Sequence, residues 1–134
     1  MRTRRKKKKR ITKTTESLQI FKSLYNRYAS NAKRRGLLFD LTYEDFEVLV
    51  TQNCYYCGDK PNQSLCRNDK HKSLIALYHG VDRVNNQKGY SYTNCVTACK
   101  TCNVGKHVLD VDDFLAMVEK IYINLIKPHK RSVR

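Results

Sequence analysis

Apolar residues recur at three- and four-residue steps near the start of the chain, and polar residues fill the positions between them. This spacing is typical of an amphipathic helix, which we expect from about Thr15 to Arg35. Thr14 or Thr15 can serve as its N-cap, and Gly36 stands where such a helix would end. The apolar face would consist of Leu18, Phe21, Leu24, Tyr25, Tyr28, Ala29 and Ala32.

A second, shorter helix is expected soon after this one. Residues 37–41 are apolar except for Asp40 and are compatible with a single strand. Thr42 and Asp45 then have the spacing of a capping box, a pair of reciprocal hydrogen bonds that starts many helices. The helix would run through about Thr51, and its inward residues would be Phe46, Leu49 and Val50.

The second half of the chain predicts one strand and two further helices. Residues 59–72 are polar and predict an irregular segment, whereas residues 74–84 are the best strand candidate. Residues 94–103 predict a short helical segment, and a last amphipathic helix would begin near Asp110 and end before Pro128. Its apolar residues are Phe114, Leu115, Val118, Ile121, Tyr122 and Leu125. Together these patterns indicate a small α+β domain.

The net charge of +15 on 134 residues predicts that the protein binds a polyanionic partner. The length allows one domain with a modest core. An acidic protein or a membrane surface could attract the same charge, but no apolar run is long enough to span a bilayer or anchor in one. Because no apolar segment follows the basic start, we expect no secretory signal and an intracellular protein.

The charge is most concentrated in residues 1–12, where eight of nine consecutive residues are positive. Such a block repels itself and cannot bury a face, so we expect a disordered tail here and a second basic tail over residues 128–134. We favour an arm that lies along DNA phosphates. A solvated tail and a nuclear import signal are the alternatives. The residues of this arm would be Arg2, Arg4, Arg5, Lys6, Lys7, Lys8, Lys9 and Arg10.

Four of the six cysteines form the pairs Cys54–Cys57 and Cys99–Cys102. Two residues between cysteines let both thiolates reach one ion, and two such pairs complete a tetrahedral zinc site. Disulfides are the alternative for six cysteines, but the missing export signal favours thiolates in a reducing compartment. Cys66 and Cys95 are left over, and either could replace an assigned ligand. For Cys95 we favour a small buried packing residue.

A set of short motifs accompanies these pairs: Gly80–Asn86, Lys88–Tyr90, Asn94 and Cys99–Lys106, with Asn31–Gly36, Phe39, Leu41–Thr42 and Cys54–Gly58 upstream. In this order they resemble the zinc-bearing, free-standing HNH endonucleases of phages and large DNA viruses, also called His-Me finger or ββα-metal nucleases. The resemblance covers roughly residues 20–125. It implies a zinc-stapled ββα-metal domain, here residues 13–127, flanked by N- and C-terminal helices.

The resemblance also implies roles for three polar residues. Asp82, at a strand end, would give an oxygen ligand to a catalytic divalent ion, and Asn103 would give a second. The expected ion is Mg²⁺ or another divalent ion, acting as a Lewis acid on the scissile phosphate. Asn94 matches an asparagine that braces the loop between the two strands of the motif. Turn and cap positions are the alternative for all three residues, since Asn and Asp often occupy them.

One position departs from the family. Arg83 stands where many members have the histidine that serves as general base, and an arginine stays protonated. Arg83 would instead hold the phosphate and stabilise its growing charge. His79 lies on the same strand face as Arg83 by parity and could replace the base. His107 is a weaker candidate, and an ordinary packing role is the alternative for each histidine.

We therefore expect a metal-dependent DNA endonuclease that nicks or cuts double-stranded DNA, with a structural Zn²⁺ and neither a membrane partner nor an organic cofactor. A non-catalytic, zinc-binding nucleic-acid-binding protein is the alternative, which Arg83 in place of a histidine keeps open. A structural or ribosome-associated basic protein is a third class. For a viral protein, the resemblance implies the host cytoplasm or nucleus.

Overall fold

The computed structural model describes residues 20–66 and 74–127, so both expected tails lie outside the described residues. Over these residues the strands form three small two-stranded sheets, with helices packed beside them. In chain order the elements are α2 (Lys22–Arg34), β1 (Phe39–Asp40), α3 (Tyr43–Thr51), β2 (Gln63–Cys66), β3 (Leu74–Tyr78), β4 (Gly80–Arg83), β5 (Tyr90–Ser91), a 3₁₀ turn (Tyr92–Asn94), β6 (Cys95–Ala98), α4 (Lys100–Lys106), α5 (Val111–Ile121) and a π-helical continuation (Tyr122–Ile126).

Helix α2 is the first amphipathic helix that the sequence predicts, but its start differs. Within the described residues it begins at Lys22 after a turn, and the expected caps Thr14 and Thr15 lie outside that part. The turn buries Phe21, whose backbone N–H donates to the Tyr43 hydroxyl at 3.3 Å instead of continuing the helix. The predicted end is confirmed, since Gly36 takes a φ of 67° and closes the helix with the backbone hydrogen bonds of a Schellman motif.

The core lies where α2 crosses α3. The predicted capping box of α3 is present, with the Thr42 hydroxyl accepting from the Asp45 N–H at 3.1 Å. All three predicted inward residues of α3 are buried, and aromatic rings of α2 meet Phe46 edge to face, the nearest being Tyr28 at 5.2 Å between centroids. The buried cluster comprises Phe21, Leu24, Ala32, Leu41, Phe46, Leu49, Val50, Val81, Tyr90 and Cys95.

The strand predicted over residues 74–84 is two strands with different partners. The chain breaks at His79, so that β3 pairs with β2 and β4 pairs with β6, both antiparallel. The prediction of a wholly irregular segment over residues 59–72 is therefore wrong, because β2 lies within it. The prediction of a helical segment over residues 94–103 is also wrong, because the first part of this segment forms β6 and α4 begins only at Lys100. The burial patterns differ as well, since residues 75–78 of β3 alternate between exposed and half-buried positions whereas every residue of β4 is buried.

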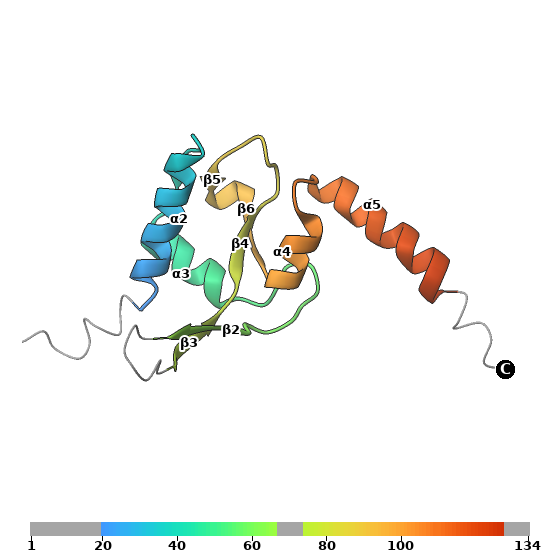
Figure 1. The fold of residues 1–134 in the computed structure, drawn as a ribbon, viewed down its shortest axis with the longest axis horizontal. Helices are drawn as coiled ribbons and strands as arrows, with labels where there is room; N and C mark the ends of the chain where they lie inside the picture. The colour runs from blue at the N-terminus through green and yellow to red at the C-terminus, as the bar shows by residue number, and fades with distance from the viewer. Residues whose placement is uncertain (1–19, 67–73, 128–134) are drawn as a thin grey trace, which may run out of the picture.

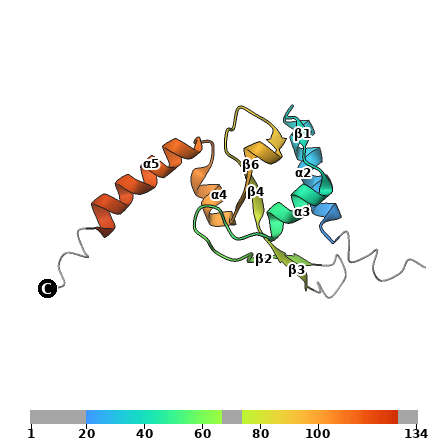
Figure 2. The ribbon, with the colours of Figure 1, turned by 180° about the vertical axis from the view of Figure 1, so that it is seen from behind.

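The antiparallel pair β4–β6 and helix α4 form a ββα unit, and α2 lies across β4 from α4 in both views (Figures 1 and 2). Helix α5 projects away from this body. The amphipathic helix expected near Asp110 is confirmed, but in α5 only Phe114 is buried, whereas Leu115, Met117, Val118 and Ile121 are exposed. Among the described helices, none combines the length and apolar character that a membrane crossing requires.

Candidate active site and metal centre

The two cysteine pairs come together at one end of the ββα unit. Cys54 and Cys57 lie in the loop after α3, Cys99 is the N-cap of α4, and Cys102 lies in its first turn. The four sulfur atoms all lie within 4.8 Å of one another, and Cys57 Sγ is 3.7 Å from Cys99 Sγ. Tetrahedral zinc with Zn–S bonds of about 2.3 Å places its sulfurs about 3.8 Å apart. The cluster therefore fits a zinc ion.

Backbone N–H groups donate hydrogen bonds into the cluster and favour the thiolate form of Cys54. The N–H of Cys99 donates to Cys54 Sγ, and that of Cys102 donates to Cys99 Sγ, both at 3.3 Å. Burial acts to raise the pKa of Cys54, but hydrogen bonds from backbone N–H groups, those of Cys57 and Cys99 foremost, lower this pKa to about 6. Cys54 is thus suited to bind a metal as a thiolate near neutral pH.

The two remaining cysteines lie outside this cluster. Cys95 is 6% exposed in β6, and burial raises its pKa to about 11, which suits a neutral packing residue. Cys66 is exposed at the end of β2. Neither belongs to the group of sulfurs that could share an ion.

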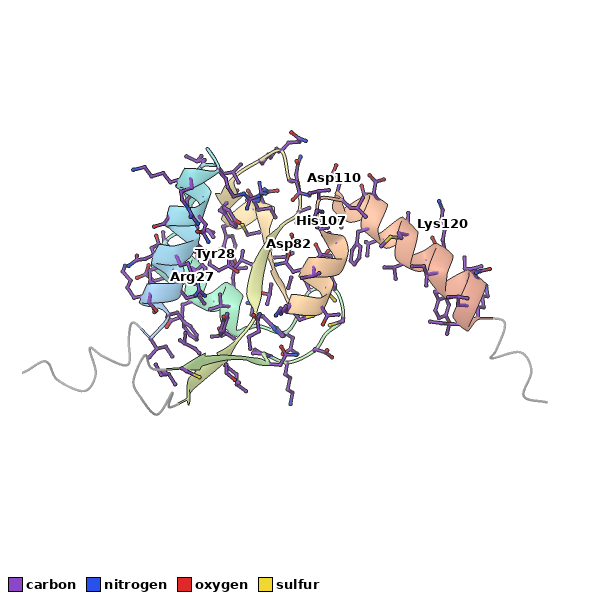
Figure 3. All side chains as sticks on the ribbon, in the orientation of Figure 1. Arg27, Tyr28, Asp82, His107, Asp110 and Lys120 are labelled. Carbon is purple, nitrogen blue, oxygen red and sulfur yellow. The ribbon has the colours of Figure 1, made fainter. Side chains whose placement is uncertain are left out.

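A cavity of about 650 Å³ lies beside the ββα unit and brings distant parts of the sequence together. One wall comes from β4, α4 and the residues just after them, and the other from α2. Figure 3 shows Asp82 and His107 on the first wall, with Arg27 and Tyr28 on α2. The lining residues are Leu24, Arg27, Tyr28, Asn31, Arg35, Gln63, Tyr78, Val81, Asp82, Arg83, Asn86, Gln87, Tyr90, Asn103, His107 and Val108.

Asp82 is 5% exposed and receives two side-chain partners. The Tyr56 hydroxyl donates to its Oδ2 at 2.6 Å, and burial together with the Asp82 carboxylate raises the pKa of Tyr56, which keeps this donor protonated. Lys106 Nζ lies 3.3 Å from both carboxylate oxygens and donates to the carbonyl oxygen of Arg83 at 3.0 Å. The Lys106 side chain is fully buried, so the ion pair is shielded from water.

Asn103 and His107 face the same cavity as Asp82. Asn103 lies on α4, near Gly80 of β4, where a Cβ would meet its Nδ2 at 3.6 Å. His107 caps α4 with a φ of 49° and a ψ of −120°, a backbone conformation that non-glycine residues rarely adopt. Such strained residues tend to occur at active sites, where the strain fixes the direction of a side chain.

The structure places His79 away from the cavity. Its side chain is fully buried, and its Nε2 donates to the carbonyl oxygen of Asp59 at 2.9 Å. The same carbonyl accepts the N–H of Cys54 at 2.9 Å, so His79 supports the loop of the first cysteine pair. The parity argument failed because the chain breaks at His79, which leaves it outside both strands.

Arg83 and Asn94 brace the loop between β4 and β5 from inside. Arg83 Nη1 donates to two loop carbonyl oxygens, those of Asn86 at 2.9 Å and Lys88 at 2.7 Å. Asn94 Oδ1 accepts the N–H of Asn85 at 3.0 Å, and its Nδ2 donates to the carbonyl oxygen of Gly89 at 2.8 Å. The bracing role expected of Asn94 stays a prediction, and it would act through these hydrogen bonds. The guanidinium group of Arg83 is already engaged with the loop, although Arg83 also lines the cavity.

Two residues that contact Asp82 were missed by the sequence analysis. Tyr56 lies within the first cysteine pair, and Lys106 follows Cys102 by one helical turn. The four-residue step from Cys102 to Lys106 was the available signal, because it places both residues on one side of α4. Lysine is rarely fully buried without a partner, and here the partner of Lys106 is the Asp82 carboxylate.

Comparison with known proteins agrees with this geometry. No family model matches the chain. Over 109 residues it is 42% identical to an uncharacterized protein of Acanthamoeba polyphaga mimivirus, a match that covers 81% of this chain and 18% of that protein. Among solved structures it is similar to the rare-cutting HNH restriction endonuclease PacI, with a TM-score of 0.54, 25% identity, and coverage of 84% of this chain and 81% of that chain.

Proposed function

We propose that this chain, whose α+β fold and four-cysteine cluster are those of a zinc-bearing HNH endonuclease, hydrolyses phosphodiester bonds of DNA with the help of a divalent metal ion. The observation that carries the proposal is the cavity on the ββα unit, where the Asp82 carboxylate and the Asn103 side chain face one space. A net charge of +15 supports a DNA substrate.

The donor atoms of this wall fit a hard cation. A carboxylate offers about four acceptor positions, so Tyr56 and Lys106 leave positions of Asp82 free for an ion. With the Asn103 amide oxygen, Asp82 gives the two protein ligands that Mg²⁺ commonly keeps beside water and phosphate. A divalent ion bound there would supply Lewis-acid stabilisation of the scissile phosphate and the departing oxygen.

We assign the role of general base to His107 in preference to His79. A base must reach the attacking water, and His107 lines the cavity whereas His79 is fully buried on Asp59. The strained backbone of His107 supports a directed side chain. Arg83 is assigned to holding the loop around Asp82, with charge stabilisation of the phosphate as a second effect.

A non-catalytic DNA-binding protein is the second candidate. It is favoured by one observation, the buried Lys106 ammonium that already neutralises Asp82. On this alternative the ion pair would replace the metal, and the cavity would bind DNA without cutting it.

Incubation of the purified protein with supercoiled plasmid separates the two candidates. We expect nicked or linear DNA with added Mg²⁺ and none without a divalent ion. Asp82→Asn keeps an oxygen for Lys106 but removes the charge that binds a cation, so it should abolish cleavage while zinc content and DNA affinity persist. A wild-type protein that binds plasmid tightly and leaves it intact with every divalent ion tried would establish the second candidate.

A further inference from the structure

We propose that one face of α2, formed by Arg27, Asn31 and the C-cap residue Arg35 and here called the α2 face, binds the phosphate backbone of the DNA that the opposite wall cleaves. The inference rests on the proposed function and adds a substrate-binding site to it. The three residues recur at four-residue steps, so they follow one side of the helix. All three line the cavity that also holds Asp82 and Asn103.

The α2 face is held at a fixed distance from the opposite wall. Tyr28, which lies between the arginines on α2, accepts the N–H of Val81 with its hydroxyl oxygen at 3.2 Å. At Gly80 a Cβ would lie 3.2 Å from that hydroxyl, so the absence of a side chain lets the helix approach β4 closely. Burial raises the pKa of Tyr28, which keeps the hydroxyl neutral in this contact. These contacts hold α2 against β4, and the two walls border one cleft.

The charges on the α2 face are free to meet a polyanion. Arg27 and Arg35 are exposed, and the ion pair found within residues 20–66 and 74–127 is that of Lys106 with Asp82. The neighbouring Arg34 donates to the Asn31 side-chain oxygen and so orients that amide. The cavity is lined by three arginines against one carboxylate. A positive cleft around a single cation-binding carboxylate complements a phosphodiester chain.

On this proposal the two walls of the cavity contact different parts of the DNA backbone. Guanidinium groups of the α2 face would hold phosphates on the far side of the cavity, which places a backbone segment between α2 and α4. Phosphate contacts of this kind position DNA without reading its sequence. Each phosphate neutralised contributes about 0.9 to the slope of log affinity against log salt concentration on duplex DNA.

The test uses the full chain with Asp82→Asn as the binding background and without a divalent ion, since the proposed function predicts that the DNA then stays uncut. Affinity for a short labelled duplex would be measured over a range of salt concentrations for Arg27→Ala, Arg35→Ala and the double variant. Lys33→Ala is the matched control, because Lys33 is an exposed basic residue of the same helix that does not line the cavity. Arg27→Lys with Arg35→Lys restores charge without the planar guanidinium groups.

We expect the salt slope to fall by about 0.9 for each arginine removed and to keep its value in the lysine variant and in Lys33→Ala. With Asp82 restored, the double alanine variant should cut plasmid more slowly, and a higher DNA concentration should recover the rate. Equal salt slopes for the double variant and Lys33→Ala would overturn the inference. If the wild type still cuts plasmid in that case, the proposed endonuclease function stands without the α2 face.

Discussion

The two walls of the cavity are built on different principles. The α2 wall is held by apolar packing, with Leu24 buried against α3 and β4, and its polar residues are exposed arginines and an amide. The β4–α4 wall depends on polar contacts instead, with four cysteines at one end and the buried pair Asp82–Lys106 in the middle. For the proposed endonuclease, this difference predicts that binding and chemistry are separable. Changes on one wall should affect affinity, and changes on the other should affect metal, stability or rate.

The largest effect is expected from removing the cluster that holds the β4–α4 wall. Cys54→Ser or Cys102→Ser should lose the zinc and the fold, because structural zinc contributes on the order of 10 kcal/mol in small domains. Elemental analysis of the wild type should find about one zinc per chain. Cys66→Ser is the matched control, since this exposed cysteine lies outside the cluster, and it should keep both zinc and circular dichroism. Well-folded wild-type protein without zinc would contradict the assignment.

The next effect concerns the buried ion pair. Asp82→Ala leaves the Lys106 ammonium buried without its carboxylate, which should cost about 3–5 kcal/mol of unfolding free energy in urea denaturation of the zinc-bound protein. Adding Lys106→Met should recover most of this loss, because the unpaired charge is then gone. Asn103→Ala is the comparison on the same wall, and it should unfold close to the wild type since Asn103 is only partly buried. Losses that simply add in the double variant would show that the pair is not coupled.

Local spacing accounts for what the sequence predicted well. The capping box at Thr42 and the glycine end of α2 depend on residues a few positions apart, so a linear pattern contains them. The cysteine cluster was equally readable, since two residues between cysteines define a knuckle whatever surrounds it. The fold class followed from these signals and from the resemblance to HNH endonucleases, and the similarity to PacI confirms it.

Contacts between distant segments account for what the sequence did not contain. Apolar residues lie on both sides of His79 in the run over residues 74–84, so its linear pattern does not show that the strand changes partner there. The burial of Lys106 depends on Asp82, which is far away in sequence. The cavity itself appears only when α2 is placed against β4 by the Tyr28 hydroxyl. The roles of the residues that line the cavity remain predictions. A comparison of His107 with His79 tests one of them, the identity of the general base.

The smallest structural change, and the sharpest test of the β4–α4 wall, is the comparison of His107 with His79. If His107 activates the attacking water, His107→Ala should lower the cleavage rate by roughly 10² to 10⁴ and leave DNA affinity and zinc content unchanged. His79→Ala should behave in the opposite way. It removes a buried ring and the hydrogen bond to the Asp59 carbonyl, so the loop of the first cysteine pair should weaken and the unfolding free energy should fall.

Single-turnover cleavage at a temperature where both variants remain folded separates rate from stability. His79→Gln serves as a further control, because its amide can donate to the Asp59 carbonyl without acting as a base. A His107→Ala protein that cuts as fast as the wild type would remove His107 from the reaction. If a folded His79→Gln protein instead shows the rate loss expected for His107→Ala, the role of base belongs to His79. His79 would then act in the reaction and would not only support the loop of the first cysteine pair.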